Sequence, residues 1–266
     1  MNGSAYFLSD LHLDSDSGER LQRLLSLLDE MSEDAKQIYF VGDVFDFWLG
    51  YSSVIFKAYY PFLRKLDDLV RSGIEVFLFS GNHDPDPGQF FTNIGVKVHE
   101  TATGIKLGDH RVWLDHGDLV DPRSRLSRLL CRSARAPLLR RLARTLHPDL
   151  AWRLSRLYAH KREGYTDPLP SALLEQYFPE RITQGYDTII IGHYHRAVRH
   201  ERVVNGKAAQ LFALGDWVEQ RTYLQYDGNE FILWRDNGSK AARCPLALGD
   251  YGPGEGHSVS SAAPGK

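Results

Sequence analysis

At the start of the chain, short apolar runs alternate with longer segments in which leucines recur at helical spacing. Three apolar runs, Ala5–Ser9, Ile38–Val41 and Glu75–Ser80, have the length of buried strands. Between them, the apolar spacing predicts helices over Arg20–Met31 and Val54–Arg71, the second of which ends at a glycine. This strand–helix–strand–helix–strand order predicts an α/β sheet that is largely parallel in the first half of the chain.

After Gly88 the apolar runs become shorter and turn signals become more frequent, which predicts more strands than helices. A helix is predicted over Ser171–Gln184, and the turns Asn205-Gly206 and Gly228-Asn229 separate antiparallel-looking pairs. The predicted strands of this half are Val96–Val98, Thr103–Leu107, Arg111–Leu114, Ile189–Ile191, Ala197–Val204, Ala208–Leu214, Arg221–Tyr226 and Phe231–Trp234. The expected fold class is therefore mixed α/β.

Five of the apolar runs are followed by Asp, Asn or His, which are metal-ligand residue types. In open α/β sheets, ligands bind beyond the carboxyl ends of the strands, where Asp10, Asp43 and Asn82 fall. The spacing of Asp10-x-His12 places two side chains on the same side of an extended segment. The complete set of candidate ligands is Asp10, His12, Asp43, Asn82, His116, His193 and His195.

These seven candidates offer oxygen and nitrogen ligands and no thiolate. They are too many for one tetrahedral zinc ion and indicate a pair of harder, higher-coordinate ions. The expected cofactor is two divalent metal ions, Mn²⁺ first, with Fe²⁺, Mg²⁺ or Zn²⁺ as alternatives. Two neighbouring ions need a shared ligand, and the carboxylate of Asp43, at the end of a rigid strand, is the expected bridge.

Length and composition narrow the class of protein. At 266 residues, with 42% hydrophobic and 25% charged residues, the chain suits one soluble domain with a large core. Cys131 and Cys244 are too few and too far apart for a disulfide framework or a cysteine-based zinc site. The sequence shows no signal peptide and no apolar run of about 18 residues, so we expect a cytoplasmic protein, soluble or peripherally attached.

The segment from Pro122 to Glu163 differs in character from the rest of the chain. It carries twelve basic residues and two acidic ones, whereas the whole chain has a formal charge of −2. Leucines recur at helical spacing, and Pro137 and Pro148 stand where new helices can begin. We expect a basic helical arm, about residues 122–164, inserted into a single domain that spans residues 1–244. Residues 245–266, rich in Gly, Ser, Pro and Ala, are expected to form a disordered tail.

Taken in order, the ligand motifs resemble those of the calcineurin-like metallophosphoesterases. The motifs run from Ala5 to about Arg196 and are Asp10-x-His12, Gly42-Asp43, Gly81-Asn82-His83-Asp84, His116 and Gly192-His193-x-His195. The resemblance implies a two-layered β-sandwich flanked by helices. It also implies that one ion is held by Asp10, His12, Asp43 and His195, and the other by Asp43, Asn82, His116 and His193.

The same resemblance implies a hydrolase in which a metal-activated water attacks phosphorus. Asp43 and His83 are the expected catalytic residues, and His83 would stabilise the transition state or protonate the leaving oxygen. Asp84 would either orient His83 or cap the turn. Three further carboxylates are expected to cap loops and not to bind metal: Asp14, Asp16 and Asp46.

Within this superfamily the chain is most similar, over roughly residues 5 to 236, to the UDP-2,3-diacylglucosamine hydrolases (diphosphatases) of lipid A biosynthesis. The similarity lies in the aromatic residues after Asp43, the basic arm after His116-Gly117-Asp118, Gly192-His193-Tyr194-His195-Arg196, and Leu214-Gly215-Asp216-Trp217-Val218 followed by Asp227-Gly228. It implies hydrolysis of the diphosphate bond of UDP-2,3-diacylglucosamine to UMP and 2,3-diacylglucosamine 1-phosphate (lipid X). The implied partners are this acylated nucleotide-sugar lipid and the anionic cytoplasmic face of the inner membrane, with no nucleic acid.

A cationic amphipathic arm beside the metals would shelter acyl chains and attract an anionic bilayer, each basic residue near the surface contributing about 1 kcal/mol. The alternative is that the apolar stripe of the arm packs on the core while its arginines are solvated. The expected substrate contacts are Asn82, His83, Asp118, Asp121, Tyr158, Lys161, Arg162 and Tyr165.

One difference from the best-known branch of these hydrolases leaves other substrates open. The best-known branch of these hydrolases has arginine where His83 stands, whereas other branches keep the histidine. The alternatives are a metal-dependent phosphodiesterase or nuclease, another nucleotide pyrophosphatase, and a non-catalytic scaffold of the same fold. A nuclease would bind the nucleic-acid backbone through the arginines of the arm. Leucines, and not stacking aromatic residues, lie between those arginines, which argues against a nuclease.

Overall fold

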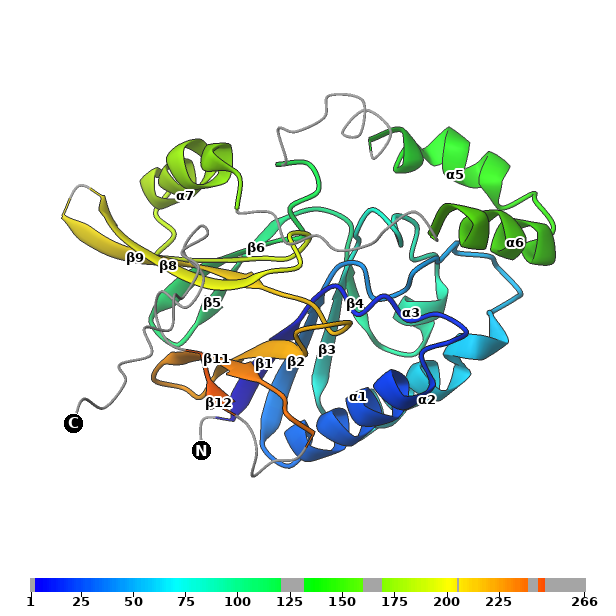
Figure 1. Cartoon of the computed structure of the whole chain (residues 1–266), viewed down its shortest axis with the longest axis horizontal. Helices are drawn as coiled ribbons and strands as arrows, with labels where there is room; N and C mark the ends of the chain where they lie inside the picture. The colour runs from blue at the N-terminus through cyan, green and yellow to red at the C-terminus, as the bar shows by residue number, and fades with distance from the viewer. Residues whose placement is uncertain (1–2, 121–131, 160–168, 205, 239–243, 247–266) are drawn as a thin grey trace, which may run out of the picture.

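The computed structural model describes residues 3–120, 132–159, 169–204, 206–238 and 244–246. Two β-sheets pack face to face, with helices on both outer faces (Figure 1). The strand order is β12-β11-β10-β1-β2-β3-β4 in the seven-stranded sheet and β5-β6-β7-β9-β8 in the five-stranded sheet. The predicted two-layered sandwich flanked by helices is confirmed.

The seven-stranded sheet combines both ends of the chain. Strands β1 to β4 run parallel, as the first half of the sequence predicts, and β10 pairs antiparallel with β1. This pairing brings the last hairpin of the chain to the first strand, which no local pattern reveals. The strands are β1 (Ser4–Leu8), β2 (Ala35–Val41), β3 (Glu75–Phe79), β4 (Lys97–His99), β10 (Thr222–Tyr226), β11 (Phe231–Arg235) and β12 (Cys244–Pro245).

The five-stranded sheet is also mixed. Its β8–β9 hairpin is antiparallel, as predicted, whereas β9 pairs with β7, and β7 with β6, in parallel. The strands are β5 (Thr103–Leu107), β6 (His110–Asp115), β7 (Thr188–Ile191), β8 (Ala197–Val204) and β9 (Lys207–Leu214).

Helices cover the two outer faces of the sandwich (Figure 1). The predicted helix over Val54–Arg71 begins later, because Pro61 lies in the first turn of α2, where its fixed φ favours a helix start. Outside the arm, the helices are α1 (Gly18–Met31), the 3₁₀ turn η1 (Lys57–Tyr59), α2 (Tyr60–Arg71), α3 (Phe90–Asn93), the π-helical turn η2 (Leu173–Tyr177) and α7 (Phe178–Thr183).

Side chains that alternate along the parallel strands contribute to two hydrophobic cores, one on each face of the sheet. Phe7, Tyr39 and Phe77 face the second sheet and stack in register, with ring centroids 4.7 and 4.3 Å apart. Their neighbours, including Leu8 and Phe40, face the opposite side and pack with residues of α1 and α2. Burial of each such side chain contributes about 1.5–3 kcal/mol. The stacked register fixes the carboxyl ends of β1, β2 and β3 along one edge.

The described part of the arm consists of residues 132–159 and contains the helices α5 (Pro137–Ala143) and α6 (Pro148–Ala159). Trp152 packs against Phe56 and Tyr59, with ring centroids 4.9 and 5.5 Å apart. The Tyr51 hydroxyl donates a hydrogen bond of 3.0 Å to the Leu146 carbonyl. These contacts place α6 and the turn before it beside the loop that follows β2.

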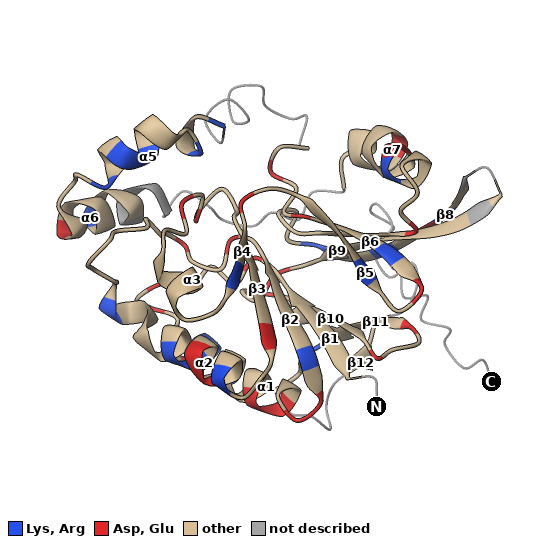
Figure 2. Ribbon diagram, turned by 180° about the vertical axis from the view of Figure 1, so that it is seen from behind, with Lys and Arg blue, Asp and Glu red and all other residues tan. Residues whose placement is uncertain are grey.

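Three arginines of the arm pair with carboxylates of the body. Arg135 pairs with Asp118, Arg144 pairs with Asp86, and Arg140 contacts Glu100 at 2.6 Å. The basic residues of α5 and the acidic loops below it appear in Figure 2. The sequence-based alternatives assigned the arginines of the arm to the membrane or to solvent, but these three dock the arm.

The sheet extends into the start of the predicted tail, since the Leu246 amide donates to the Leu233 carbonyl at 2.8 Å. Residues 247–266, which make up the rest of that tail, lie outside the described residues, as do residues 121–131 and 160–168 of the arm. Within the described ranges, the helices are too short or too polar to cross a membrane.

Candidate metal centre

Five of the predicted ligands share a strained backbone conformation. Among the residues that the structure describes, only one other non-glycine residue, Arg221, has a positive φ. Such a conformation costs about 1–3 kcal/mol per residue and persists where the surrounding structure enforces it. The five angles are 53° at Asp10, 42° at His12, 51° at Asp43, 70° at His193 and 49° at His195. Strain gathered at the ends of three strands marks a functional site.

Asp10, His12 and His195 form one group of ligand atoms. The Nε2 atoms of His12 and His195 are 3.2 Å apart. Asp10 Oδ1 lies 3.9 Å from His12 Nε2 and 3.5 Å from His195 Nε2. Ligand atoms bound about 2.0–2.2 Å from one ion lie roughly 3 Å from one another, so these three atoms fit around a single cation.

Asp43, Asn82, His116 and His193 form a second group. His116 Nε2 lies 3.4 Å from Asp43 Oδ2 and 3.3 Å from Asn82 Oδ1. A ligand atom of His193 lies within 4.8 Å of those of Asp43 and His116. The structure therefore brings all seven predicted ligands together in two adjoining groups.

Asp43 faces both groups, because its Oδ2 also lies 3.8 Å from His12 Nε2. The flanking glycines make room for this arrangement. A Cβ atom at Gly81 would overlap the Asp43 carboxylate, and one at Gly42 would overlap the His116 ring. The Gly42-Asp43 and Gly81-Asn82 motifs thus combine a ligand with the only residue type that allows such close packing.

The charges of the centre are arranged to hold a cation. Burial acts to raise the pKa of Asp43, but His116, His83 and His12 hold it well below its ordinary range. Burial acts to lower the pKa of His116, but Asp43 raises it well above its ordinary value. Asp10 Oδ1 is buried and accepts no hydrogen bond from the part of the chain that the structure describes. A field that draws a proton onto an imidazole also attracts a metal ion, so these residues fit divalent cations.

Three of the imidazoles are oriented through their other ring nitrogen, as is usual for metal ligands. His116 Nδ1 donates to the Val41 carbonyl at 3.0 Å. The Nδ1 atoms of His12 and His195 lie 3.5 and 3.4 Å from carboxylate oxygens of Asp46 and Asp216. From the sequence, Asp46 is expected only to cap a loop, and Asp216 has no predicted role. The Leu214–Val218 motif was the available signal for Asp216.

Asp84 caps the turns that carry the ligands. Its carboxylate accepts backbone hydrogen bonds from Gly81 at 2.7 Å, Val44 at 2.8 Å and Asp43 at 3.2 Å. Of the two roles considered for Asp84, the structure shows the capping one. Burial, and then the Asp43 carboxylate, raises the pKa of Asp84.

His83 lies at the edge of the centre and is held by Asp46. Its Nδ1 donates a 2.8 Å hydrogen bond to the Asp46 carbonyl, so its Nε2 is directed toward Asp43 Oδ2 at 3.9 Å. The His83 and His12 rings meet edge to face, with centroids 4.6 Å apart. An imidazole fixed in this way presents one nitrogen to any group bound beside Asp43.

Residues 4–197 match the family model of the calcineurin-like phosphoesterases. The chain belongs to this family. As a calcineurin-like phosphoesterase it is a metal-dependent hydrolase, and its seven ligand positions lie within or at the edge of the matched segment.

This phosphoesterase is also similar to curated proteins named UDP-2,3-diacylglucosamine hydrolase. The Porphyromonas gingivalis protein is 31% identical over 264 residues, which cover 88% of this chain and 97% of that protein. The Pseudomonas putida (strain W619) protein is 30% identical over 236 residues, with 85% and 96% covered. A solved structure of Vps29 from Entamoeba histolytica covers 92% of this chain and 99% of its own, with 14% identity and a TM-score of 0.42.

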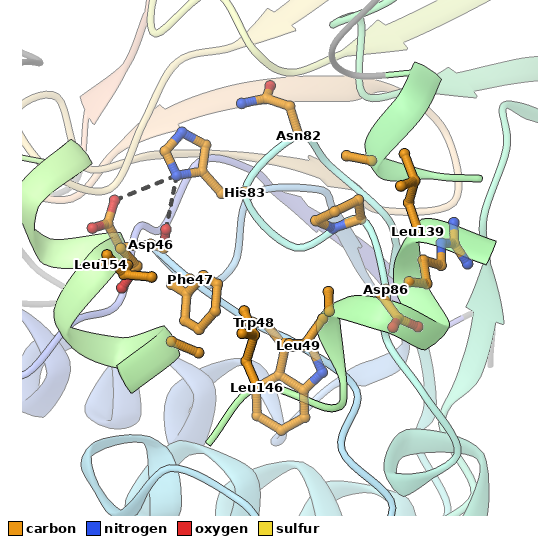
Figure 3. Close-up of a pocket in the computed structure, with 16 residues that line it drawn as sticks. Asp46, Phe47, Trp48, Leu49, Asn82, His83, Asp86, Leu139, Leu146 and Leu154 are labelled. Carbon is orange, nitrogen blue, oxygen red and sulfur yellow. Dashed lines mark hydrogen bonds and ion pairs between the residues drawn. The ribbon is translucent and has the colours of Figure 1, made fainter. Parts of the chain in front are cut away.

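An apolar cleft of about 440 Å³ opens beside the metal centre of the phosphoesterase. Asn82 and His83 stand at one end, and leucines of the arm lie on either side (Figure 3). Its apolar lining comes from the loop after β2, from both arm helices and from the turn between them: Phe47, Trp48, Leu49, Leu139, Ala143, Leu146, Ala151 and Leu154. The arm and the aromatic residues after Asp43 thus enclose one space.

The predicted substrate contacts have different surroundings. Asn82 and His83 border both the metal centre and the cleft. Asp118 is buried and paired with Arg135, and a contact between Asp118 and a sugar stays a prediction. Asp121, Lys161, Arg162 and Tyr165 lie outside the described residues, and Tyr158 belongs to α6 in a stretch whose side chains are not described.

Proposed function

We propose that this phosphoesterase hydrolyses the diphosphate bond of UDP-2,3-diacylglucosamine to UMP and 2,3-diacylglucosamine 1-phosphate (lipid X), a step of lipid A biosynthesis. The observation that carries the proposal is the apolar cleft that begins at Asn82 and His83. A substrate with a diphosphate at one end and acyl chains at the other matches a metal centre adjoined by a leucine-lined cleft. The names of the relatives in Porphyromonas gingivalis and Pseudomonas putida support the same substrate.

The cleft favours a lipid over a nucleic acid. A strand of nucleic acid needs a basic groove with aromatic side chains on which the bases stack. Here the two aromatic residues, Phe47 and Trp48, lie among leucines and alanines, and Trp48 is only 3% exposed. Burial of each acyl CH₂ group contributes about 0.8 kcal/mol, so a leucine-lined space gains affinity from chain length.

In the proposed reaction, two divalent ions, with Mn²⁺ as the first candidate, activate a water molecule and neutralise phosphate charge when bound. Asp10, His12, Asp43 and His195 would hold one ion, and Asp43, Asn82, His116 and His193 the other. Asp43 would contribute to both ion sites from one rigid strand end. His83, held through Nδ1 by Asp46, donates the proton from Nε2 to the oxygen that leaves phosphorus.

The exposed face of the arm supports a membrane-bound substrate. Leu138, Leu142 and Leu150 are 68%, 55% and 47% exposed, and they lie near the exposed Arg141 and Arg153. Such a mixture suits the surface of an anionic bilayer, in which leucines enter the interface and arginines meet lipid phosphates. The proposed location is therefore the cytoplasmic face of the inner membrane.

The test is release of UMP from UDP-2,3-diacylglucosamine by the purified protein, with and without added Mn²⁺. We expect UMP and the acylated sugar phosphate in equal amounts, and loss of the reaction on chelation that added Mn²⁺ reverses. Protein that hydrolyses a simple phosphodiester well but releases no UMP would contradict the proposed substrate and favour the phosphodiesterase alternative.

Filling the cleft tests the role of the arm. Ala143→Trp places a large ring among Leu139, Leu146 and Leu154. If it displaces about two CH₂ groups of acyl chain, we expect KM for the acylated substrate to rise about tenfold or more. The matched control is Leu138→Trp on the same helix, where the side chain is 68% exposed and outside the cleft lining. Equal KM values for both variants would place the acyl chains elsewhere.

A further inference from the structure

Arg135 connects the arm to the two loops that carry Asn82 and His116. Its Nη1 donates to Asp118 Oδ2 at 2.8 Å and its Nη2 to Asp118 Oδ1 at 3.1 Å. Nη2 also reaches the carbonyl oxygens of Ser80 and Gly81 at 3.3 and 3.4 Å. One guanidinium group therefore contacts the residues just before Asn82 and a residue just after His116.

The surroundings of Arg135 suit the planar, charged guanidinium group of an arginine. The Asp118 side chain is 2% exposed and that of Arg135 15% exposed, so the pair is largely removed from water. Arginine matches the two carboxylate oxygens at once and still offers hydrogens to the two carbonyl groups, which a lysine ammonium cannot do in this geometry.

The loops that Arg135 holds are closely packed at the metal centre. Gly81 packs directly against the Asp43 carboxylate, and Gly117 has a φ of 103°. His116 Nε2 and Asn82 Oδ1 are 3.3 Å apart, and this separation depends on how the two loops sit against each other. Arg135 is the described arm residue that contacts both loops.

We propose that Arg135 is a positioning residue that couples the seating of the arm to the geometry of Asn82 and His116. An arm seated over the cleft holds these two ligands at the separation that one cation needs. An arm displaced from the cleft releases the guanidinium group, and the two loops lose their common partner. The link from acyl-chain binding to this coupling rests on the proposed function, but the coupling of Arg135 to the metal ligands does not.

The other two docking arginines, Arg140 and Arg144, anchor the arm to the body of the protein. Arg144 also pairs through two nitrogens with a buried carboxylate, that of Asp86, and Arg140 contacts Glu100 after β4. Among the described residues, neither donates a hydrogen bond to Ser80, Gly81 or Asp118. Loss of either arginine removes one anchor of the arm but leaves Arg135 in contact with the ligand loops.

The experiment is calorimetric titration of the metal-free protein with Mn²⁺, in the absence of substrate. For Arg135→Gln and Arg135→Lys we expect one of the two binding events to weaken by about 10–100-fold, the usual effect of losing a residue that supports metal ligands. For the control variants Arg144→Gln and Arg140→Gln we expect both binding events to match those of the wild-type protein. If Arg135→Gln fails to fold, Arg135→Lys, which keeps the charge, decides the matter.

Double variants identify which ion is affected. The effect of Arg135→Lys should persist in an Asp10→Ala background and disappear in a His116→Ala background. Unchanged Mn²⁺ binding by Arg135→Lys, or equal weakening by Arg144→Gln, overturns the proposal and leaves Arg135 as one more anchor. Since no substrate enters the titration, failure to release UMP from the acylated nucleotide sugar is a separate result.

Discussion

Asp43→Ala is expected to abolish hydrolysis and to weaken the binding of both metal ions. The Asp43 carboxylate is 3.8 Å from His12 Nε2 and 3.4 Å from His116 Nε2, so its loss removes an oxygen from each ligand group. It also leaves buried imidazoles without their counter-charge. We expect kcat to fall by more than about 100-fold, the upper range for loss of a supporting residue. Elemental analysis and steady-state kinetics on the same preparation measure both effects.

Asp10→Ala is the matched control, because Asp10 Oδ1 lies beside His12 Nε2 and His195 Nε2, in one of the two ligand groups. It should weaken mainly one ion. An Asp43→Ala protein with full metal content and an unchanged rate would remove Asp43 from the centre of the mechanism.

His83→Ala is expected to lower kcat by about 10²–10⁴-fold, the usual contribution of a general acid, while both ions remain bound. The loss should depend on the leaving group. Hydrolysis of the p-nitrophenyl ester of UMP should suffer less than hydrolysis of the matched phenyl ester, because p-nitrophenolate leaves without needing a proton whereas the more basic phenolate benefits from one. The measurement is kcat on both substrates, together with the metal content of the variant.

Measuring kcat and metal content together separates two roles of His83 that the geometry allows, that of a metal ligand and that of a catalytic residue. The ligand atoms of His12, Asp43 and His83 also lie within 4.8 Å of one another, as the atoms around a metal do. Loss of one ion equivalent from His83→Ala would make His83 a ligand. Equal losses on both substrates, with the metal retained, would favour stabilisation of the transition state over proton donation.

The parallel strands and the metal-ligand residues can be predicted because both depend on patterns that are local in the chain, whereas the two-layered sandwich is predicted only through the family resemblance. Short continuous apolar runs define β1, β2 and β3, and ligand residue types follow them directly. The parallel order of these strands then places Asp10, Asp43 and Asn82 at one edge without further information. The late start of α2 was also readable in principle, since Pro61 marks it.

Residues whose roles depend on distant contacts could not be predicted in this way. Asp46 and Asp216 orient His12 and His195 only because separate loops meet in the folded chain. The pairing of β10 with β1 joins segments more than 200 residues apart. The docking of Arg135, Arg140 and Arg144 on carboxylates of the body likewise required the fold, because an amphipathic basic segment has the same sequence pattern whether it meets a membrane or a protein.

The strained backbone at five ligand positions has a consequence for the protein in the cell. The folded chain bears this strain with or without ions, whereas the ions bind only where the fold has assembled their ligands. An ion present at about 100 times its Kd adds about 2.7 kcal/mol to the stability of the folded state, which is comparable to the strain at one or two of these positions. We therefore expect added divalent cation to slow proteolysis of the folded protein as well as to support its activity.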